Sequence, residues 1–186
     1  MDISKDDSVL DPACGSGAFL IKAYDYQKQL YAEENEDRDL VVEGGYAKLS
    51  NFESEKSINR KILKNNIHGV DLNQEAVELS RINLWLRSIQ KETPLNKLDH
   101  NLRTGNSLIN DNEDSLKSYF GSSPEKEHFD FSTEFNEVLD EGGFDAIVGN
   151  PPWGAELSSG EKEYLSDRYD LDEQNLNVFE CFIRLG

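Results

Sequence analysis

Four apolar segments of this chain each end at an acidic or amide side chain, and this repeated arrangement constrains the fold more than any other feature. The side chains at or just beyond the ends of these segments are Asp11, Asp71, Asn106 and Asn150. Helical patterns separate the segments, which predicts an α/β fold with a mostly parallel sheet and helices on both faces. Ligands bind beyond the carboxyl ends of such strands, so the four side chains predict an active site.

The expected elements follow from hydrophobic periodicity and from Gly, Pro and Asn residues that begin or end helices and strands. The predicted strands cover residues 9–11, 67–71, 101–105 and 144–149. The predicted helices cover residues 18–33, 57–65, 73–87, with Asn73 as N-cap, and 175–185. Residues 33–57 are expected to form a charged excursion from the core, and residues 111–140 are polar and helical at best.

Length and composition indicate one soluble domain. The 186 residues allow one substantial core. No apolar run approaches the roughly 18 residues that span a bilayer, and no secretory leader is present, so a cytoplasmic protein is expected. Cys14 and Cys181 match neither a zinc-ligand spacing nor a dense disulfide framework, which predicts reduced thiols and no metal site.

The charge balance argues against direct contact with a polyphosphate. The chain has 37 acidic and 19 basic residues, a formal net charge of −18. Cationic side chains are what neutralise nucleic-acid phosphates. Either the chain does not bind nucleic acid, or the basic surface lies elsewhere in a larger protein. Adaptation to a salt-rich cytoplasm is a weaker explanation, because Lys outnumbers Arg.

The first strand leads into a glycine turn between two carboxylates. Gly15 and Gly17 allow a tight reversal and the close approach of a ligand. The third small residue of a dinucleotide fingerprint is missing, because Leu20 stands at that position. Asp11 suits a cationic amino group, and Asp71 is placed to accept hydrogen bonds from ribose hydroxyls. Each carboxylate alone would also suit a helix cap or a turn, but together they fit S-adenosylmethionine.

The tetrapeptide Asn150-Pro151-Pro152-Trp153 is a candidate amine-binding site. The Asn150 side-chain oxygen and the Pro151 carbonyl can accept the two hydrogens of an exocyclic amine. Two acceptors would localise the nitrogen lone pair and direct it at an electrophilic methyl group, so that positioning is the main contribution. Trp153 offers a flat face for stacking a base. In isolation the tetrapeptide could also be a proline turn that covers an apolar core.

Three ordered segments make the chain resemble amino-group DNA methyltransferases. These segments are residues 11–20 (DPACGSGAFL), 67–73 (IHGVDLN) and 150–153 (NPPW). The resemblance is strongest to the adenine-N6 group of restriction–modification enzymes, including fused restriction–methylation polypeptides similar to Eco57I. The Asn-Pro-Pro-aromatic signature is shared with methyltransferases that act on RNA and on protein glutamine, whereas the first segment is more specific.

The resemblance implies a residue-by-residue assignment of the site. Asp11, Gly15 and Gly17 would contact the methionine part of the cofactor, and Asp71 its ribose. The full cofactor-binding set is expected to be Asp11, Ala13, Gly15, Gly17, Phe19, Asp71, Leu72, Asn106 and Ser107. The catalytic set is Asn150, Pro151, Pro152 and Trp153, which would hold an adenine flipped out of the DNA stack. Asn106 stands where the family usually has Asp, and Phe179 is expected beside the flipped base.

By the same resemblance, residues 1–186 form a single, partial methyltransferase domain with a Rossmann-like fold truncated at both ends. The expected activity is methyl transfer from S-adenosylmethionine to adenine N6 in DNA. DNA would be bound through a target-recognition domain absent from this chain, with a restriction nuclease or specificity module as a further partner, and the fragment alone would be weak or inactive. The alternatives are an RNA or protein-glutamine N-methyltransferase, and a non-catalytic binding module with this fold.

Overall fold

A four-stranded parallel sheet forms the centre of the molecule. The computed structural model describes residues 3–39, 55–88, 98, 100–111, 113–121 and 128–185. The strands are β1 (Val9–Asp11), β2 (Ile67–Asp71), β3 (Leu102–Thr104) and β4 (Ala146–Ile147). They lie in the order β3-β2-β1-β4 and every pairing is parallel, with Leu10 of β1 opposite His68 of β2 and Ile147 of β4. The predicted α/β class with a parallel sheet is confirmed.

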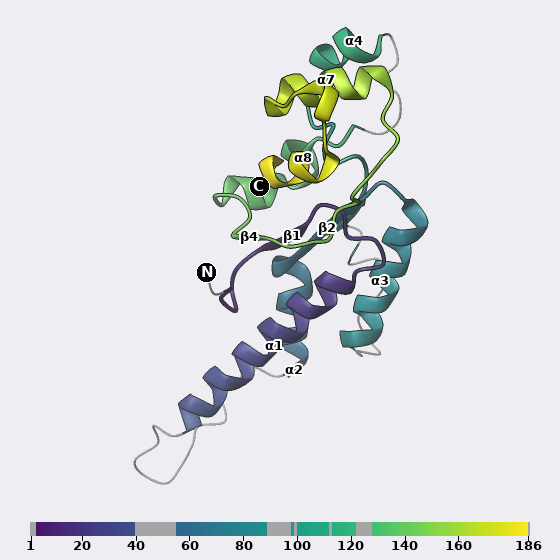
Figure 1. Ribbon diagram of the computed structural model, residues 1–186. Helices are drawn as coiled ribbons and strands as arrows, with labels where there is room; N and C mark the ends of the chain where they lie inside the picture. The colour runs from purple at the N-terminus through teal and green to yellow at the C-terminus, as the bar shows by residue number, and fades with distance from the viewer. Residues whose placement is uncertain are drawn as a thin grey trace.

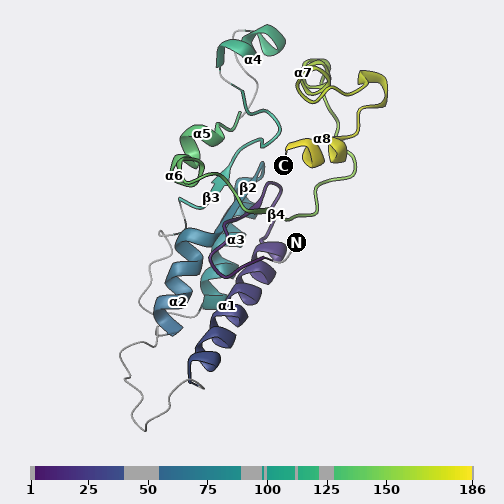
Figure 2. The same cartoon turned by 90° about the vertical axis from the view of Figure 1, so that its left-hand side faces the viewer.

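Helices cover both sides of this sheet (Figures 1 and 2). On one side lie α1 (Ala18–Asp39), α2 (Glu55–Lys61) with a π-helical turn η2 (Ile62–Asn66), and α3 (Gln74–Ser88). On the other side lie α4 (Glu113–Phe120), α5 (Phe131–Glu134), α6 (Asn136–Asp140), α7 (Ser159–Tyr169), a 3₁₀ turn η4 (Glu173–Asn175) and α8 (Val178–Leu185). The helices α4 and α7 lie away from the strands in Figure 1, and the second face of the sheet packs against the β3–β4 connection.

Alternation along the strands divides the core between the two faces. Val9 and Ile67 are buried in the cluster that packs against α1, α2 and α3. Leu10 and Val70, which point to the opposite face, are buried with Phe129 and other aromatic residues of the β3–β4 connection. Successive side chains of a strand point to opposite faces, so two short strands contribute to both halves of the core.

A second apolar cluster lies outside the sheet and joins α4, α7 and α8. Leu116, Leu165 and Cys181 are fully buried in it. A capping box begins α7, in which the Ser158 hydroxyl accepts from the Glu161 amide and the Glu161 carboxylate accepts from the Ser158 amide. Such a box satisfies two amides that a helix start leaves unpaired. Helix α7 is not among the helices predicted from the sequence, which resume after Trp153 only at residue 175.

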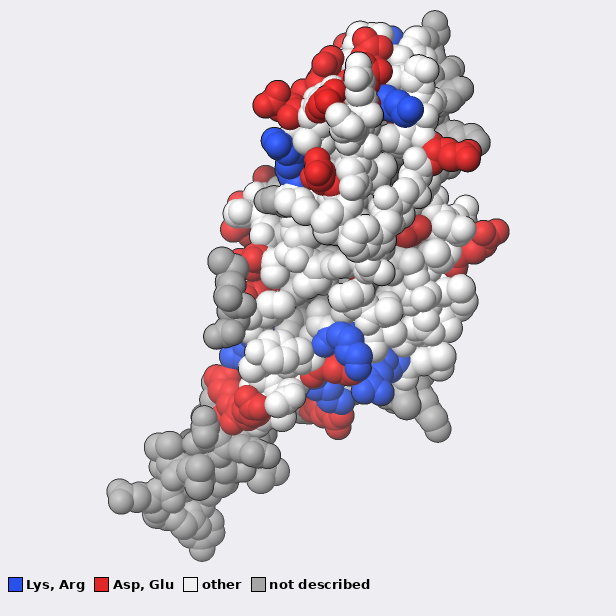
Figure 3. Space-filling model, in the orientation of Figure 1, with Lys and Arg blue, Asp and Glu red and all other residues white. Residues whose placement is uncertain are grey.

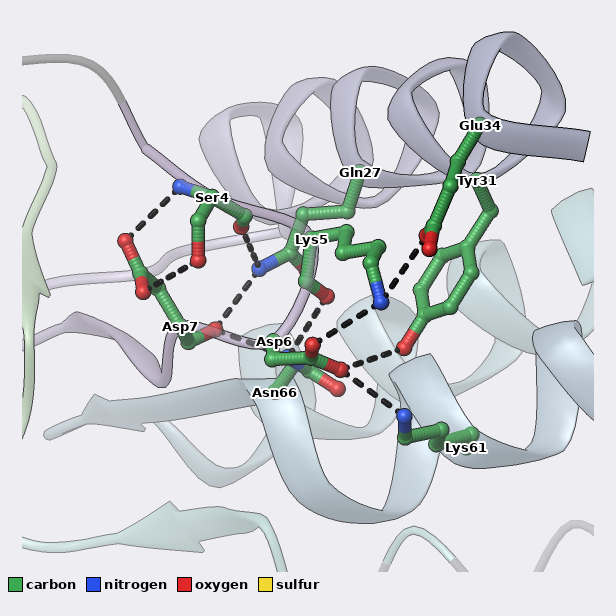
Figure 4. A network of polar contacts seen from close by, with 9 residues as sticks. All are labelled: Ser4, Lys5, Asp6, Asp7, Gln27, Tyr31, Glu34, Lys61 and Asn66. Atoms are coloured by element: carbon green, nitrogen blue, oxygen red, sulfur yellow. Dashed lines mark hydrogen bonds and ion pairs between the residues drawn. The ribbon is translucent and has the colours of Figure 1, made fainter. Parts of the chain in front are cut away.

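Polar contacts tie the segment before β1 to α1 and to η2 (Figure 4). The Asp6 carboxylate accepts from Lys61 Nζ and from the Tyr31 hydroxyl, both at 2.8 Å. The buried amide of Asn66 donates to the Asp7 carbonyl at 2.9 Å. The Lys61 ammonium, more than the other contacts of this carboxyl, lowers the pKa of Asp6 below its ordinary value. These contacts fix the direction in which the chain enters β1.

Several predicted boundaries differ from the structure. The first helix continues to Asp39, and β4 comprises only Ala146 and Ile147 of the predicted strand at 144–149. Most of the expected excursion at 33–57 lies outside the described residues. Cys14 and Cys181 are buried free thiols, as the sequence predicted.

The described surface is acidic over the helices outside the sheet. Figure 3 shows acidic side chains gathered where α4 and α7 lie, and exposed members of this group include Asp114, Glu163 and Asp167. Such a surface repels phosphate groups. Within the described ranges, no helix is both long and apolar enough to cross a membrane.

Candidate active site

The polar residues predicted at the strand ends lie along one edge of the sheet. Asp11 is the last residue of β1 and Asp71 the last residue of β2. Asn106 follows β3 by two residues, and Asn150 follows β4 by three residues. Because the strands are parallel neighbours, all four positions share the carboxyl edge. The predicted location of the site therefore agrees with the topology.

The glycine turn is bonded to the neighbouring strand end and to α3. The Gly15 amide donates to Asp71 Oδ2 at 2.8 Å, and Asn83 Nδ2 donates to the Ser16 carbonyl at 3.0 Å. Gly15 has φ +51°, which favours glycine, and a Cβ there would meet nothing within 4 Å. The glycine turn is thus held by the end of β2 and by α3, while the position of a Cβ on Gly15 is open.

Gly17 is required for a different reason. It has φ +86°, and a Cβ at this position would overlap the Ser80 hydroxyl of α3. Ser80 is fully buried. The φ of Gly17 agrees with the predicted tight reversal, and its missing side chain allows α3 to pack closely against the turn, a role that the sequence did not predict. No sequence signal distinguished Ser80 or Asn83 from the other residues of α3.

Asp71 supports the turn and still has acceptor capacity. Its Oδ2 accepts from Gly15, its Oδ1 accepts from the Asn73 amide at 2.9 Å, and its backbone carbonyl accepts from Gly105 at 3.0 Å. An ionised carboxylate has about four lone-pair sites. The two side-chain bonds leave room for further donors, such as the paired hydroxyls of a ribose.

Asp11 is a carboxylate in an unfavourable environment. It is only 1% exposed, and its Oδ1 accepts from the Ala13 amide at 3.0 Å. Burial raises the pKa of Asp11 from 3.8 to about 6; the hydrogen bond from Ala13 opposes this rise, and the nearby charge of Asp71 adds to it. A buried negative charge of this kind is stabilised by a positively charged ligand, which makes the position a candidate for binding a cation.

Two apolar side chains flank the carboxylates at the surface. Phe19, at the start of α1, is 46% exposed, and Leu72, directly after β2, is 57% exposed. Both belong to the predicted cofactor-binding set. Their exposure next to Asp71 and the glycine turn provides apolar surface that a flat or aliphatic ligand group could cover.

The residues that follow β3 support the glycine turn that follows β1. Ser107 is 3% exposed, and its hydroxyl donates to the Pro12 carbonyl at 2.6 Å. Asn106 is half-buried, and its Oδ1 accepts from the Leu108 amide at 3.1 Å. The Ser107 hydroxyl is thus engaged within the protein, so its place in the predicted cofactor set is better explained by support of the turn than by direct contact. Asn106 keeps its amide nitrogen as a donor.

The Asn-Pro-Pro-Trp segment is accessible, and its aromatic side chain has a partner. Asn150 and Pro152 are exposed, and Trp153 is 76% exposed. The Trp153 indole stacks on the Phe179 ring of α8, with the ring centroids 5.3 Å apart and the planes inclined by 8°. The structure therefore brings Phe179 beside Trp153, whereas its predicted place beside a flipped base stays a prediction.

Comparisons with known proteins match this chain to methyltransferase families and to restriction–modification enzymes. The Eco57I restriction-modification methylase family matches residues 65–186, and the RMKL-like methyltransferase domain family matches residues 1–111. The type II restriction enzyme and methyltransferase RM.Eco57I of Escherichia coli is 34% identical over 93% of this chain, which corresponds to 18% of that protein.

Two further relatives are described as adenine-specific. The adenine-specific methyltransferase PglX of Streptomyces coelicolor is 29% identical over 78% of this chain and 12% of its own length. The adenine-specific methyltransferase BrxX of Escherichia coli is 39% identical over 39% of this chain and 5% of its own length. The chain thus spans less than a fifth of the length of each of these three relatives.

Proposed function

This chain belongs to the Eco57I restriction-modification methylase family, and on that premise we propose that it is the cofactor-binding and catalytic part of a DNA adenine-N6 methyltransferase. The all-parallel sheet and the match to a methyltransferase domain confirm the Rossmann-like fold predicted from the sequence. The methyl donor, the target atom and the residues that act on them are the proposal.

The carboxyl edge of β1 and β2 fits S-adenosylmethionine. Asp71 would accept from the ribose hydroxyls, and the buried Asp11 would face the positively charged methionine end. A Cβ at Gly15 would meet nothing within 4 Å, which leaves room for a ligand there, and the exposed Leu72 would offer apolar surface to the adenine ring. When bound, this cofactor supplies a methyl group on a positively charged sulfur, which makes the methyl carbon electrophilic.

The end of β4 would hold the acceptor amine. Asn150 and the Pro151 carbonyl would each accept one hydrogen of the adenine N6 amine, and the Trp153 ring would stack on the base. The nitrogen lone pair would then point at the methyl group without prior removal of a proton. Fixed acceptors that orient a nucleophile lower the barrier mainly by positioning and electrostatics.

The observation that carries the proposal is that the proposed cofactor site, at the ends of β1 and β2, is adjacent to the proposed amine site, after β4. β1 and β4 are hydrogen-bonded neighbours, and the segment just before Asn150 lies against the Asp11 carboxylate. A methyl donor held at β1 and β2 and an amine held at β4 would therefore meet at one edge of the sheet.

We further propose that DNA is gripped by other parts of the full-length polypeptide. The net charge of −18 and the acidic face over α4 and α7 oppose binding of phosphates by this chain. The relatives named above are more than five times as long, which leaves ample sequence for a basic target-recognition module. A restriction nuclease would be a second such partner.

The first experiment is calorimetric titration of the chain with S-adenosylmethionine, beside Asp71→Ala and the control Glu75→Ala, an exposed acid on α3. We expect saturable binding that is lost in Asp71→Ala and retained in the control. The full-length enzyme would then be assayed on DNA, on RNA and on a glutamine peptide, with N6-methyladenine in DNA as the expected product. Absence of binding by both this chain and the full-length enzyme would refute the cofactor assignment.

A further inference from the structure

Gly149, the residue before the Asn-Pro-Pro-Trp segment, lies directly against the buried carboxylate of Asp11. A Cβ at position 149 would be 2.7 Å from Asp11 Oδ1 and 3.4 Å from Asp11 Cγ. A carbon atom cannot approach a carboxylate oxygen that closely without displacing it. The space that a side chain would need at position 149 is therefore already filled by the acid of the glycine turn.

The backbone does not require glycine at this position. Gly149 is not among the residues with positive φ, unlike Gly15 and Gly17. Its φ therefore does not call for glycine, and the demand that the structure shows at position 149 is one of space. The demand comes from one side chain, because the three atoms nearest to a Cβ there all belong to Asp11.

Hydrogen bonds hold both partners of this contact in place. Asp11 is 1% exposed and its Oδ1 is bonded to the Ala13 amide. The end of β4 is tied to β1 by the Val148 amide, which donates to the Leu10 carbonyl at 2.9 Å. Added volume at position 149 must therefore either turn the Asp11 carboxylate out of its place or push the start of the Asn150 segment away from β1.

We propose that Gly149 is a positioning residue that couples the two halves of the site through the Asp11 side chain. The contact sets the orientation of the carboxylate that faces the cofactor and the distance of the amine acceptors from it. Its consequence for methyl transfer rests on the function proposed above, whereas the contact itself does not. The residue that precedes the Asn-Pro-Pro-Trp segment thereby controls affinity for the cofactor without touching it.

The test is a double-mutant cycle between positions 149 and 11, with Gly154→Ala as the matched control. Gly154 directly follows the Asn-Pro-Pro-Trp segment, as Gly149 directly precedes it, and a Cβ at Gly154 would meet nothing within 4 Å. We expect Gly149→Ala to lower the melting temperature of the ligand-free chain by about 5 °C. The same change should cost almost nothing in an Asp11→Ala background, where the obstructing carboxylate is gone. It should keep its cost in Asp11→Asn, because the amide has the same volume.

Two readouts separate this role from general destabilisation. The affinity for S-adenosylmethionine should fall about tenfold or more in Gly149→Ala at temperatures where the variant is fully folded, and remain unchanged in Gly154→Ala. The ¹³C resonance of the Asp11 carboxyl should titrate differently in Gly149→Ala, and as in the wild type in Gly154→Ala.

The outcomes of this test can be distinguished from those that test the proposed function. An equal loss of melting temperature in the wild-type and Asp11→Ala backgrounds, or an unchanged titration of Asp11 in Gly149→Ala, would overturn the inference. If the wild-type chain and the full-length enzyme bind no S-adenosylmethionine while the thermal cycle still shows coupling, the contact stands and the proposed function fails.

Discussion

The Asp11 carboxylate should destabilise the ligand-free chain at neutral pH, so that Asp11→Asn makes the chain more stable. Asparagine has nearly the same shape, and its oxygen can still accept from the Ala13 amide. What the variant removes is the cost of a buried negative charge. The pKa of Asp11 rises from 3.8 to about 6 on folding. A difference of about two units at 1.36 kcal/mol each corresponds to about 3 kcal/mol in the free energy of unfolding.

The sign of the pH dependence follows from the direction of the shift. The pKa of Asp11 is higher in the folded state than in the unfolded state, so the folded chain binds this proton more tightly. The destabilisation is therefore absent below about pH 4, grows between about pH 4 and 6, and is complete above that range. The difference between Asp11→Asn and the wild type should follow the same course.

The assay is urea unfolding of both proteins at several pH values, followed by circular dichroism. Glu75→Gln serves as the control, since Glu75 is exposed on α3 and should change the stability by less than about 0.5 kcal/mol. The affinity for S-adenosylmethionine should move the opposite way, because the amide cannot pair with a cationic amino group. An Asp11→Asn chain that is less stable than the wild type at pH 8, or a stability difference that does not vary with pH, would refute the reasoning.

Three further predictions address separate parts of the molecule. Asn150→Ala should retain S-adenosylmethionine binding by calorimetry but lower methylation by the full-length enzyme about 100-fold, as expected for loss of an orienting acceptor; weakened cofactor binding would place Asn150 elsewhere. Ser107→Ala should lower the free energy of unfolding by about 1–2 kcal/mol in urea, because the Pro12 carbonyl is left buried without its donor. Asp6→Asn should cost roughly 0.5–1 kcal/mol at pH 7, since its pair with Lys61 is half exposed, and in the same assay the cost should begin to decline only as the pH falls below about 4, toward the lowered pKa of this carboxyl.

The sequence predicted the strand ends well because those positions obey local rules. An apolar run that stops at a carboxylate, followed by Gly15 or by the N-cap Asn73, specifies both an element and its boundary. Such rules predicted β1, β2 and the edge at which the site lies. The order of the strands along the sheet, by contrast, depends on packing between distant segments.

The features that sequence reasoning missed depend on contacts between distant residues. Ser80 meets Gly17, and Asp11 meets Gly149, across more than 60 positions of sequence in each case. Hydrophobic periodicity does not reveal a position that must be glycine because a distant side chain fills the space that its Cβ would need. Helix α7 was missed because its polar and apolar residues show no clear amphipathic pattern, and it is held instead by a capping box and by burial of Leu165 against α4 and α8.

The acidic balance of the chain and its proposed chemistry are consistent because the charges act at different places. At the carboxyl edge, Asp11 and Asp71 are held close together by the turn, where a positively charged ligand relieves both the burial cost and the mutual repulsion. On α4 and α7 the acids face solvent, where salt screens them and they interact weakly with the site. Phosphates approaching the Trp153 end of the site would still meet a negative surface. Under the proposed function, cationic groups from outside this chain would bring DNA to Asn150, while the carboxylates of the strand ends would retain the methyl donor.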